Sequence, residues 1–182
     1  GGAMRQSGAT LMELMVVLAV SAILLGVGIP SFASLVQTSR LSSVTNEMLS
    51  SLHLARSEAI KRNSRAVICP SVDGSHCAGS GDWYQGWLVF HDANNNAARD
   101  AGEAVVLAHG TLPQGLNITG DSKLSKYISY SPTGGGKLIS GTWQFGSLTL
   151  CSESGGSLAA RKIIISSTGR PRSEKIVLDS CP

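Results

Sequence analysis

The sequence predicts an α+β protein in which a long N-terminal helix precedes an antiparallel, β-rich globular head. Two observations carry this prediction. Apolar residues recur at helical spacing in the first third of the chain, and short strand-like runs separated by turn residues make up the remainder. The 182 residues, 42% of them hydrophobic, suffice for one anchor and one globular domain of ordinary size.

The first element is an apolar segment that spans residues 9–30. It carries no charge between Leu14 and Ile29, and a helix of this length, at about 1.5 Å per residue, covers a bilayer core of about 30 Å. A secretory signal has a shorter apolar part that ends in a small-residue cleavage site, whereas this segment leads into a second helical pattern. We therefore expect residues 9–30 to be a retained transmembrane helix and residues 1–8 to be a leader removed on the cytoplasmic side.

Residues 31–63 have the pattern of an amphipathic helix. Apolar side chains recur at three- and four-residue spacing, with charged side chains on the other faces. The apolar positions are Val44, Met48, Leu52, Ala55 and Ala59. This pattern predicts one long helix, kinked near Gly26, Gly28 and Pro30, whose second half packs on the head.

From residue 64 to residue 182 the spacing changes to that of strands. Short β-rich runs alternate with clusters of Gly, Asn, Asp and Ser. The runs are RAVICP, GWLVFHD, EAVVLAH, YISYS, TWQFGSLTL, RKIIISS and KIVLD. They predict an antiparallel sheet or two packed sheets as the head.

Four cysteines indicate the compartment of the head. Cys69 and Cys77 bracket a short loop, and Cys151 and Cys181 would tie the last strands together, which is one of three possible pairings. The spacing lacks the paired CxxC pattern of zinc sites. Disulfides in an oxidising compartment are therefore the better interpretation.

The start of the chain resembles a prepilin signal. Gly8, Ala9, Thr10, Leu11 and Glu13 are similar to the type III signal of that family, although Ala9 stands where phenylalanine is commoner. The resemblance implies cleavage after Gly8 by a prepilin peptidase and N-methylation of Ala9. It also implies that Glu13 neutralises the N-terminal ammonium of a neighbouring subunit in the filament, because each charge alone in apolar surroundings is costly. The alternative is that Glu13 lies at the headgroup level.

Three further blocks resemble the FimT and GspH family of minor pilins and pseudopilins: LHLARSEAIKRNSRAVICPS, GDWYQGWLVFHD and STGRPR. The resemblance implies a low-abundance subunit of a type IV pilus or of a type II secretion pseudopilus, with other pilins as its partners. Such a subunit lies in the inner membrane with a periplasmic head and then enters the extracellular filament. No cofactor or catalytic activity is implied.

The C-terminal segment, residues 161–182, is basic, with five basic and two acidic side chains. Strands expected at 162–166 and 175–178 flank the GRxR element of STGRPR and place it on a turn. This element is similar to the DNA-binding motif of competence-associated FimT proteins, and arginine suits phosphate oxygens. The resemblance implies weak, sequence-independent binding of double-stranded DNA for natural transformation. The expected site comprises Gly169, Arg170, Arg172, Lys175, Arg161 and Lys162.

Two alternatives to DNA binding remain open. The arginines of an ordinary hairpin could pair with acids such as Glu174, in a structural GspH-type pseudopilin that binds no nucleic acid. A calcium-stabilised adhesin would instead use the loop after residue 91, whose oxygen-bearing side chains occupy calcium-loop positions one, three, five, nine and twelve. They are Asp92, Asn94, Asn96, Asp100 and Glu103. Ala97 replaces the glycine required at position six, so a polar hairpin loop is the better interpretation and no metal is expected.

An enzyme is not expected, because the four histidines are scattered and no serine or cysteine lies in a nucleophile motif. Trp83, Tyr84 and Trp87 are interpreted as sheet core or turn cover rather than as a surface on which bases stack.

Overall fold

The structure is a computed structural model that describes residues 10–152 and 158–182, apart from the side chains of residues 27–31, 33, 34 and 158. The chain divides into two compact units, residues 1–38 and 39–182. The predicted leader, the cleavage site at Gly8 and the methylated residue Ala9 lie outside the described residues. Of the residues at the expected kink, Gly28 and Pro30 have side-chain surroundings that also lie outside the description. Among the described residues, no helix is both long enough and apolar enough to span a membrane.

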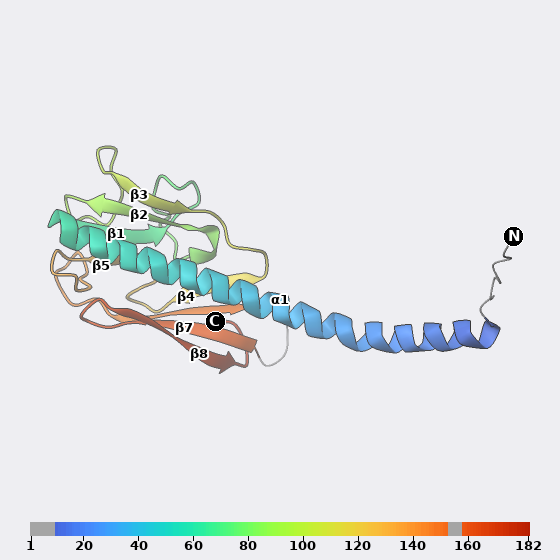
Figure 1. The fold of residues 1–182 in the computed structure, drawn as a ribbon. Helices are drawn as coiled ribbons and strands as arrows, with labels where there is room; N and C mark the ends of the chain where they lie inside the picture. The colour runs from blue at the N-terminus through green and yellow to red at the C-terminus, as the bar shows by residue number, and fades with distance from the viewer. Residues whose placement is uncertain (1–9, 153–157) are drawn as a thin grey trace, which may run out of the picture. The chain divides into compact units, whose positions relative to one another are not determined.

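Helix α1, Leu11–Arg62, begins with a side-chain cap (Figure 1). The hydroxyl oxygen of Thr10 accepts a hydrogen bond from the backbone N–H of Glu13, at 3.2 Å. Threonine is a favoured capping residue, and a carboxylate in the first turn interacts favourably with the positive end of the helix dipole. Glu13 is exposed. Within the single chain, its role is therefore limited to stabilising the start of the helix.

In the described part of the head, eight strands form two four-stranded antiparallel sheets, visible on the two sides of α1 in Figure 1. The first sheet has the order β3-β2-β1-β5, with β1 Arg65–Pro70, β2 Trp87–Asp92, β3 Val105–His109 and β5 Ile128–Tyr130. The second has the order β4-β6-β7-β8, with β4 Leu116–Gly120, β6 Gly146–Ser152, β7 Leu158–Ile165 and β8 Pro171–Leu178. A short 3-10 helix, Trp83–Gln85, precedes β2.

The second half of α1 packs against both sheets through the predicted apolar stripe. All five stripe residues are buried, and Met48 and Leu52 are fully so. One core cluster joins them to Ile68 of β1 and Ile163 of β7. Trp87 also bonds the helix directly, since its indole N–H donates to the Ser51 hydroxyl at 2.9 Å. The second half of the helix and both sheets therefore share one core.

The strands differ from the sequence prediction in several places. β6 begins at Gly146 rather than at Thr142, and β7 begins at Leu158 rather than at Arg161. β4 was not predicted, because LNITG is short, follows Gly115 and ends in Gly120. β8 begins at Pro171 rather than at Lys175, so Arg172 lies on the strand and not in a turn. An edge strand tolerates a proline at its first residue, where its missing N–H removes no ladder hydrogen bond.

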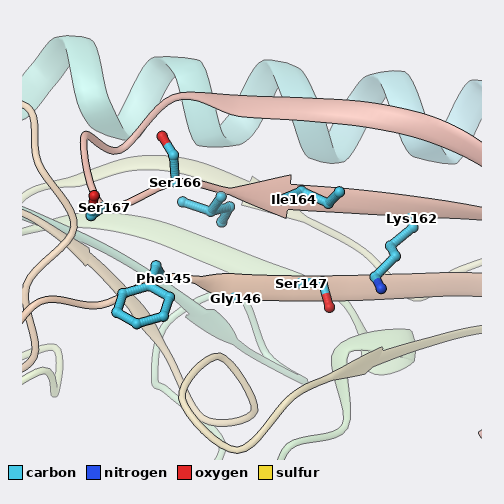
Figure 2. A pocket seen from close by; sticks show the side chains of 8 residues that line it. Phe145, Gly146, Ser147, Lys162, Ile164, Ser166 and Ser167 are labelled. Carbon is cyan, nitrogen blue, oxygen red and sulfur yellow. The ribbon is translucent and has the colours of Figure 1, made fainter.

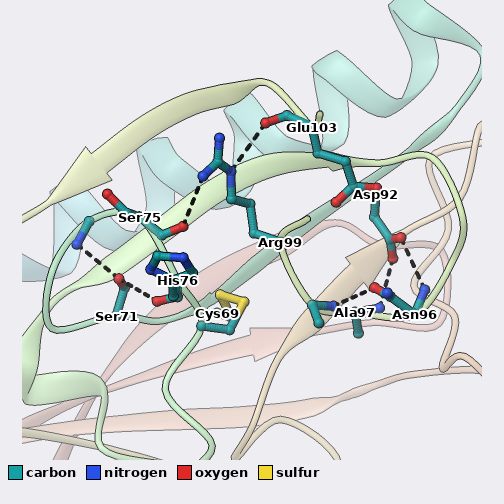
Figure 3. Close-up of a disulfide and its surroundings, with 12 residues drawn as sticks. Cys69, Ser71, Ser75, His76, Asp92, Asn96, Ala97, Arg99 and Glu103 are labelled. Atoms are coloured by element: carbon teal, nitrogen blue, oxygen red, sulfur yellow. Dashed lines mark hydrogen bonds between the residues drawn. A yellow bond between two sulfur atoms is a disulfide. The ribbon is translucent and has the colours of Figure 1, made fainter. Parts of the chain in front are cut away.

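Both disulfides, Cys69–Cys77 and Cys151–Cys181, join the cysteines in the expected pairs. The first closes a loop beside β1 that is tied to the loop after β2 (Figure 3). Arg99 makes this connection, because its guanidinium donates to the carbonyl of Ser75 at 3.4 Å and to that of Glu103 at 3.2 Å.

The disulfide-closed loop contains a carboxylate with an unusual titration. Asp73 pairs with the ring of His76 at 2.9 Å and accepts the backbone N–H groups of Ser75 and His76, each at 2.8 Å. The His76 side chain, followed by these backbone donors, holds the pKa of Asp73 well below its usual range. Since folding lowers this pKa, the contribution to stability is present above the unfolded pKa of about 3.9 and is lost as the pH falls toward the folded value.

We predict that Asp73 stays ionised in the folded head at pH 3. A titration of its side-chain carboxyl carbon by NMR checks this prediction. A midpoint for Asp73 near the ordinary value of about 3.9 would contradict the prediction.

Candidate nucleic-acid interface

The turn between β7 and β8 is held in place by a close backbone contact. Gly169 has φ +77° and donates its N–H to the carbonyl of Ser166 at 2.8 Å. A Cβ at Gly169 would overlap the carbonyl oxygen of Gly134 and lie 3.1 Å from Cε1 of Tyr130. Only glycine permits both the left-handed backbone and this approach. The turn is therefore docked against the loop that follows β5.

The antiparallel register distributes the predicted basic residues over two faces. Arg161 pairs with Lys175, Lys162 with Glu174, and Ile164 with Arg172. Because successive side chains point to opposite faces of a sheet, Lys162 and Arg172 share one face while Arg161 and Lys175 share the other. The guanidinium of Arg161 donates to the Ser42 hydroxyl of α1 at 3.0 Å, which identifies its face as the one toward the helix.

The six predicted residues therefore do not form one patch. Gly169 and Arg170 lie at the turn, Arg172 lies next to the turn on the outer face of β8, and Arg161 belongs to the packing of sheet and helix. The expectation of two arginines on one loop is corrected in this respect, because the strand begins before Arg172.

Both arginines of the GRxR element are exposed. Among the described residues, neither Arg170 nor Arg172 forms an ion pair, and no side-chain hydrogen bond holds either of them. Glu174, the acid considered as a partner, lies across from Lys162 in the register and forms no ion pair with another described residue. The two guanidinium groups are available to an anionic ligand.

A first hollow, of about 400 Å³, lies on the outer face beside the turn. Figure 2 shows Phe145 at one end and Lys162 and Ile164 along β7, with Ser166 and Ser167 of the turn. Phe145 is 47% exposed, and the ammonium of Lys123 lies 3.9 Å from its ring centroid. This hollow therefore combines an aromatic ring with one lysine, Lys162, and a second lysine, Lys123, lies over that ring.

A second hollow, also of about 400 Å³, lies on the other flank of the turn. Its lining comes from three separate segments of the head, and the residues are Arg56, Thr133, Gly135, Trp143, Thr168 and Arg170. The guanidinium Nε of Arg56 donates to the carbonyl of Gly134 at 2.9 Å, so the helix holds the same loop on which Gly169 rests. Trp143 is 52% exposed and the ammonium of Lys137 lies 4.8 Å from its ring centroid.

The aromatic residues of both hollows were missed by the sequence analysis. The sequence pattern that could have identified them is the alternation of Trp143 and Phe145 about the polar Gln144. Gln144 is buried, and its side-chain amide donates to the carbonyls of Lys123 and Tyr127 at 2.7 and 2.8 Å. An inward Gln144 leaves its two neighbours facing outward. Trp83 and Trp87, which were interpreted from the sequence as sheet core or turn cover, are fully buried.

In the loop after β2, the carboxylates of the candidate calcium ligands accept hydrogen bonds from the loop itself (Figure 3). The two carboxylate oxygens of Asp92 accept the backbone N–H groups of Asn96 and Ala97, at 3.1 and 3.0 Å. Glu103 accepts the N–H groups of Ala93 and Asp100, at 2.7 and 3.1 Å. Asn94 and Asn96 both donate side-chain N–H groups to Asp100. This is the geometry of a self-closed polar loop, and no group of three or more metal-binding side chains occurs among the described residues.

The N-terminal helix is capped at its start, and its second half packs on a head of two antiparallel sheets. This combination defines a pilin-like protein. Residues 3–29 match the prokaryotic N-terminal methylation motif, and residues 44–169 match the family of type II transport protein GspH. The chain belongs to this GspH family and is similar to type IV minor pilins.

Individual relatives agree with this family. The chain is 31% identical to the pilin-like protein PilA1 of Thermus thermophilus, with 94% of this chain and all of that one covered. Its fold is similar to that of the type IV minor pilin FimU of Pseudomonas aeruginosa, with TM-scores of 0.56 and 0.55 in two crystal forms and 21% identity. The first comparison covers 78% of this chain and 100% of FimU, and the second 80% and 98%. At this identity the FimU structures bear on the fold alone.

Proposed function

We propose that this protein is a minor pilin of a type IV pilus whose head binds double-stranded DNA through the turn between β7 and β8, for DNA uptake. One observation carries the proposal: Arg170 and Arg172 are exposed beside a rigid, glycine-docked turn and have no acidic partner among the described residues. Guanidinium groups bind phosphate oxygens in a forked geometry, and backbone contacts of this type are independent of base sequence.

Processing of the N-terminus, anchoring in the membrane and assembly into the filament belong to the same proposal. A prepilin peptidase would remove residues 1–8 before Ala9 is methylated, and residues 9–30 would hold the protein in the inner membrane until it enters the filament. Glu13 would pair with the N-terminal ammonium of a neighbouring subunit there, since both charges are costly alone in apolar surroundings. The head would then lie in the periplasm and afterwards outside the cell, where disulfides persist.

The number of phosphate contacts limits the strength of this site. Two or three contacts contribute about two or three units to the slope of log affinity against log salt concentration. A single head is therefore expected to bind DNA weakly. Several heads along one filament could raise the avidity.

The proposal predicts that Arg170→Gln combined with Arg172→Gln abolishes most duplex binding. In a salt series followed by fluorescence anisotropy, the double variant loses about two units of the salt slope and at least about tenfold in affinity at low salt. Arg40→Gln is the matched control, because Arg40 is exposed on α1 and has the same charge. Equal binding by the double variant and the wild type would contradict the proposal.

The alternative is a structural subunit of a type II secretion pseudopilus, which the GspH family match favours. A folded protein that binds no duplex at high concentration supports this alternative. So does a gene deletion that abolishes protein secretion and leaves DNA uptake normal.

A further inference from the structure

The second hollow combines Arg170 with Arg56 and Trp143, two residues that the proposed duplex binding through Arg170 and Arg172 does not use. We propose that this hollow seats one nucleotide of single-stranded DNA, with its phosphate on Arg56 and Arg170 and its base stacked on Trp143. The inference rests on the proposed DNA-binding function and assigns to it a second, strand-specific subsite.

The phosphate part of the subsite consists of two guanidinium groups that are 114 positions apart in the sequence and line the same hollow. The bond from Nε of Arg56 to Gly134 fixes that guanidinium and leaves both terminal nitrogens for a ligand. Arg170 has no side-chain partner among the described residues. None of the residues that line the hollow is acidic. A recess with two positive charges and no negative one favours an anion, and the fork of arginine matches phosphate.

The hydroxyl groups of Thr133 and Thr168 complete the polar wall. Each lies within hydrogen-bond distance of one serine hydroxyl, Ser131 at 2.9 Å and Ser166 at 2.8 Å. The Ser131 hydroxyl donates its one proton to the carbonyl of Gly135 at 3.0 Å, so Thr133 donates to Ser131. Thr168 can accept from Ser166 and still donate to a phosphate oxygen.

The base part of the subsite is the exposed indole of Trp143. Gly135 lies against it, since a Cβ there would be 3.0 Å from Cζ3 of the ring, and the absence of that atom lets the loop approach the indole. The ammonium of Lys137 lies over the ring in an exposed cation–π contact. Such a contact is weaker than the stacking of a base on an aromatic ring, so a base can displace Lys137 from the ring.

The arrangement selects for single strands. In a duplex the bases are stacked on each other and paired, so a phosphate and its own base cannot enter one hollow together. A single strand can turn its base outward onto an aromatic side chain while the backbone follows positive charge. A volume of about 400 Å³ lies within the range of small-ligand sites, of about 300–1,000 Å³, and limits the subsite to one nucleotide.

The test compares three DNA probes on the full chain in a non-ionic detergent. The probes are a twelve-nucleotide oligo-dT, an abasic twelve-mer with the same phosphates, and a twelve-base-pair duplex. Tryptophan fluorescence reports on the subsite, because the other two tryptophans of the chain, Trp83 and Trp87, are fully buried. We expect oligo-dT to quench this fluorescence and to bind at least about fivefold more tightly than the abasic probe.

Four variants separate the subsite from the turn. Trp143→Ala is expected to abolish the preference for oligo-dT over the abasic probe, and Trp143→Phe to retain part of it. Phe145→Ala is the matched control, since it removes the exposed aromatic ring of the first hollow and should leave the preference unchanged. Arg172→Gln is expected to weaken duplex binding without changing the ratio between the two single-stranded probes.

The outcomes distinguish the two claims. Equal binding of oligo-dT and the abasic probe, with duplex binding that still depends on Arg172, overturns the subsite and leaves the proposed function in place. A preference for oligo-dT that requires Trp143, without duplex binding, supports the subsite and overturns binding of the duplex by the turn. If no probe binds the folded protein, both claims are overturned.

Discussion

Replacing Gly169 by alanine is expected to destabilise the head by about 2–4 kcal/mol and to weaken duplex binding. The left-handed backbone at φ +77° costs an alanine about 1 kcal/mol. The added Cβ would also overlap the carbonyl of Gly134, a backbone atom that cannot move without shifting its loop. Relief of this overlap separates the turn from the loop and displaces Arg170. Urea unfolding and DNA titration measure the two effects.

Gly141→Ala is the matched control for this substitution. Gly141 has a similar backbone, φ +86°, but no atom lies within 4 Å of a Cβ built there. It should therefore show only the backbone cost of about 1 kcal/mol and normal DNA binding. If both variants lose the same stability, the close contact between the turn and Gly134 does not contribute, and the rigid turn assumed for Arg170 loses its basis.

Leu52→Ala is expected to destabilise the head by about 2–5 kcal/mol. Leu52 is fully buried on α1 and belongs to the cluster that both sheets share. Its truncation removes apolar contacts and leaves a cavity at a place where helix and strands are held by their neighbours. Thermal and urea unfolding measure the loss. DNA binding by the folded fraction should be unchanged, because the turn is not touched.

His53→Ala provides the comparison at the next position of the same helix. His53 is exposed, so its replacement should change the stability by no more than about 0.5 kcal/mol. A loss for Leu52→Ala as small as this would mean that the helix does not join the two sheets.

The helix and most strands could be predicted because their signals are local. The stripe that includes Met48 and Leu52 recurs at helical spacing, and runs such as RAVICP carry enough β-branched residues to be recognised. β4 could not be predicted in this way, because its five residues have no strong pattern and pair with β6, about 30 positions later. The start of β8 was predicted too late, because a proline is rarely part of a strand. Pairing of Pro171 with Ile165 of β7 nevertheless begins the strand at this proline.

The candidate site was only half predictable for the same reason. Arg170 and Arg172 stand out through a short motif, but their distribution over the faces depends on the register with β7. Arg56 reads as one more charged position on an amphipathic helix, and only the fold brings it beside Arg170 and Trp143. The count of charges in residues 161–182 therefore overestimated the size of the basic patch, because Arg161 points toward the helix and donates to Ser42.

Mapping of duplex DNA on the protein by NMR tests the central claim most directly. A short duplex is titrated into the isotope-labelled chain at low salt, and backbone amide shifts are followed. We predict shift changes concentrated at the turn between β7 and β8 and at Arg172, which disappear in the Arg170→Gln, Arg172→Gln double variant and weaken as salt is added. A folded protein whose shifts do not move at high DNA concentration, or move elsewhere on the head, would contradict the claim and favour the structural pseudopilin.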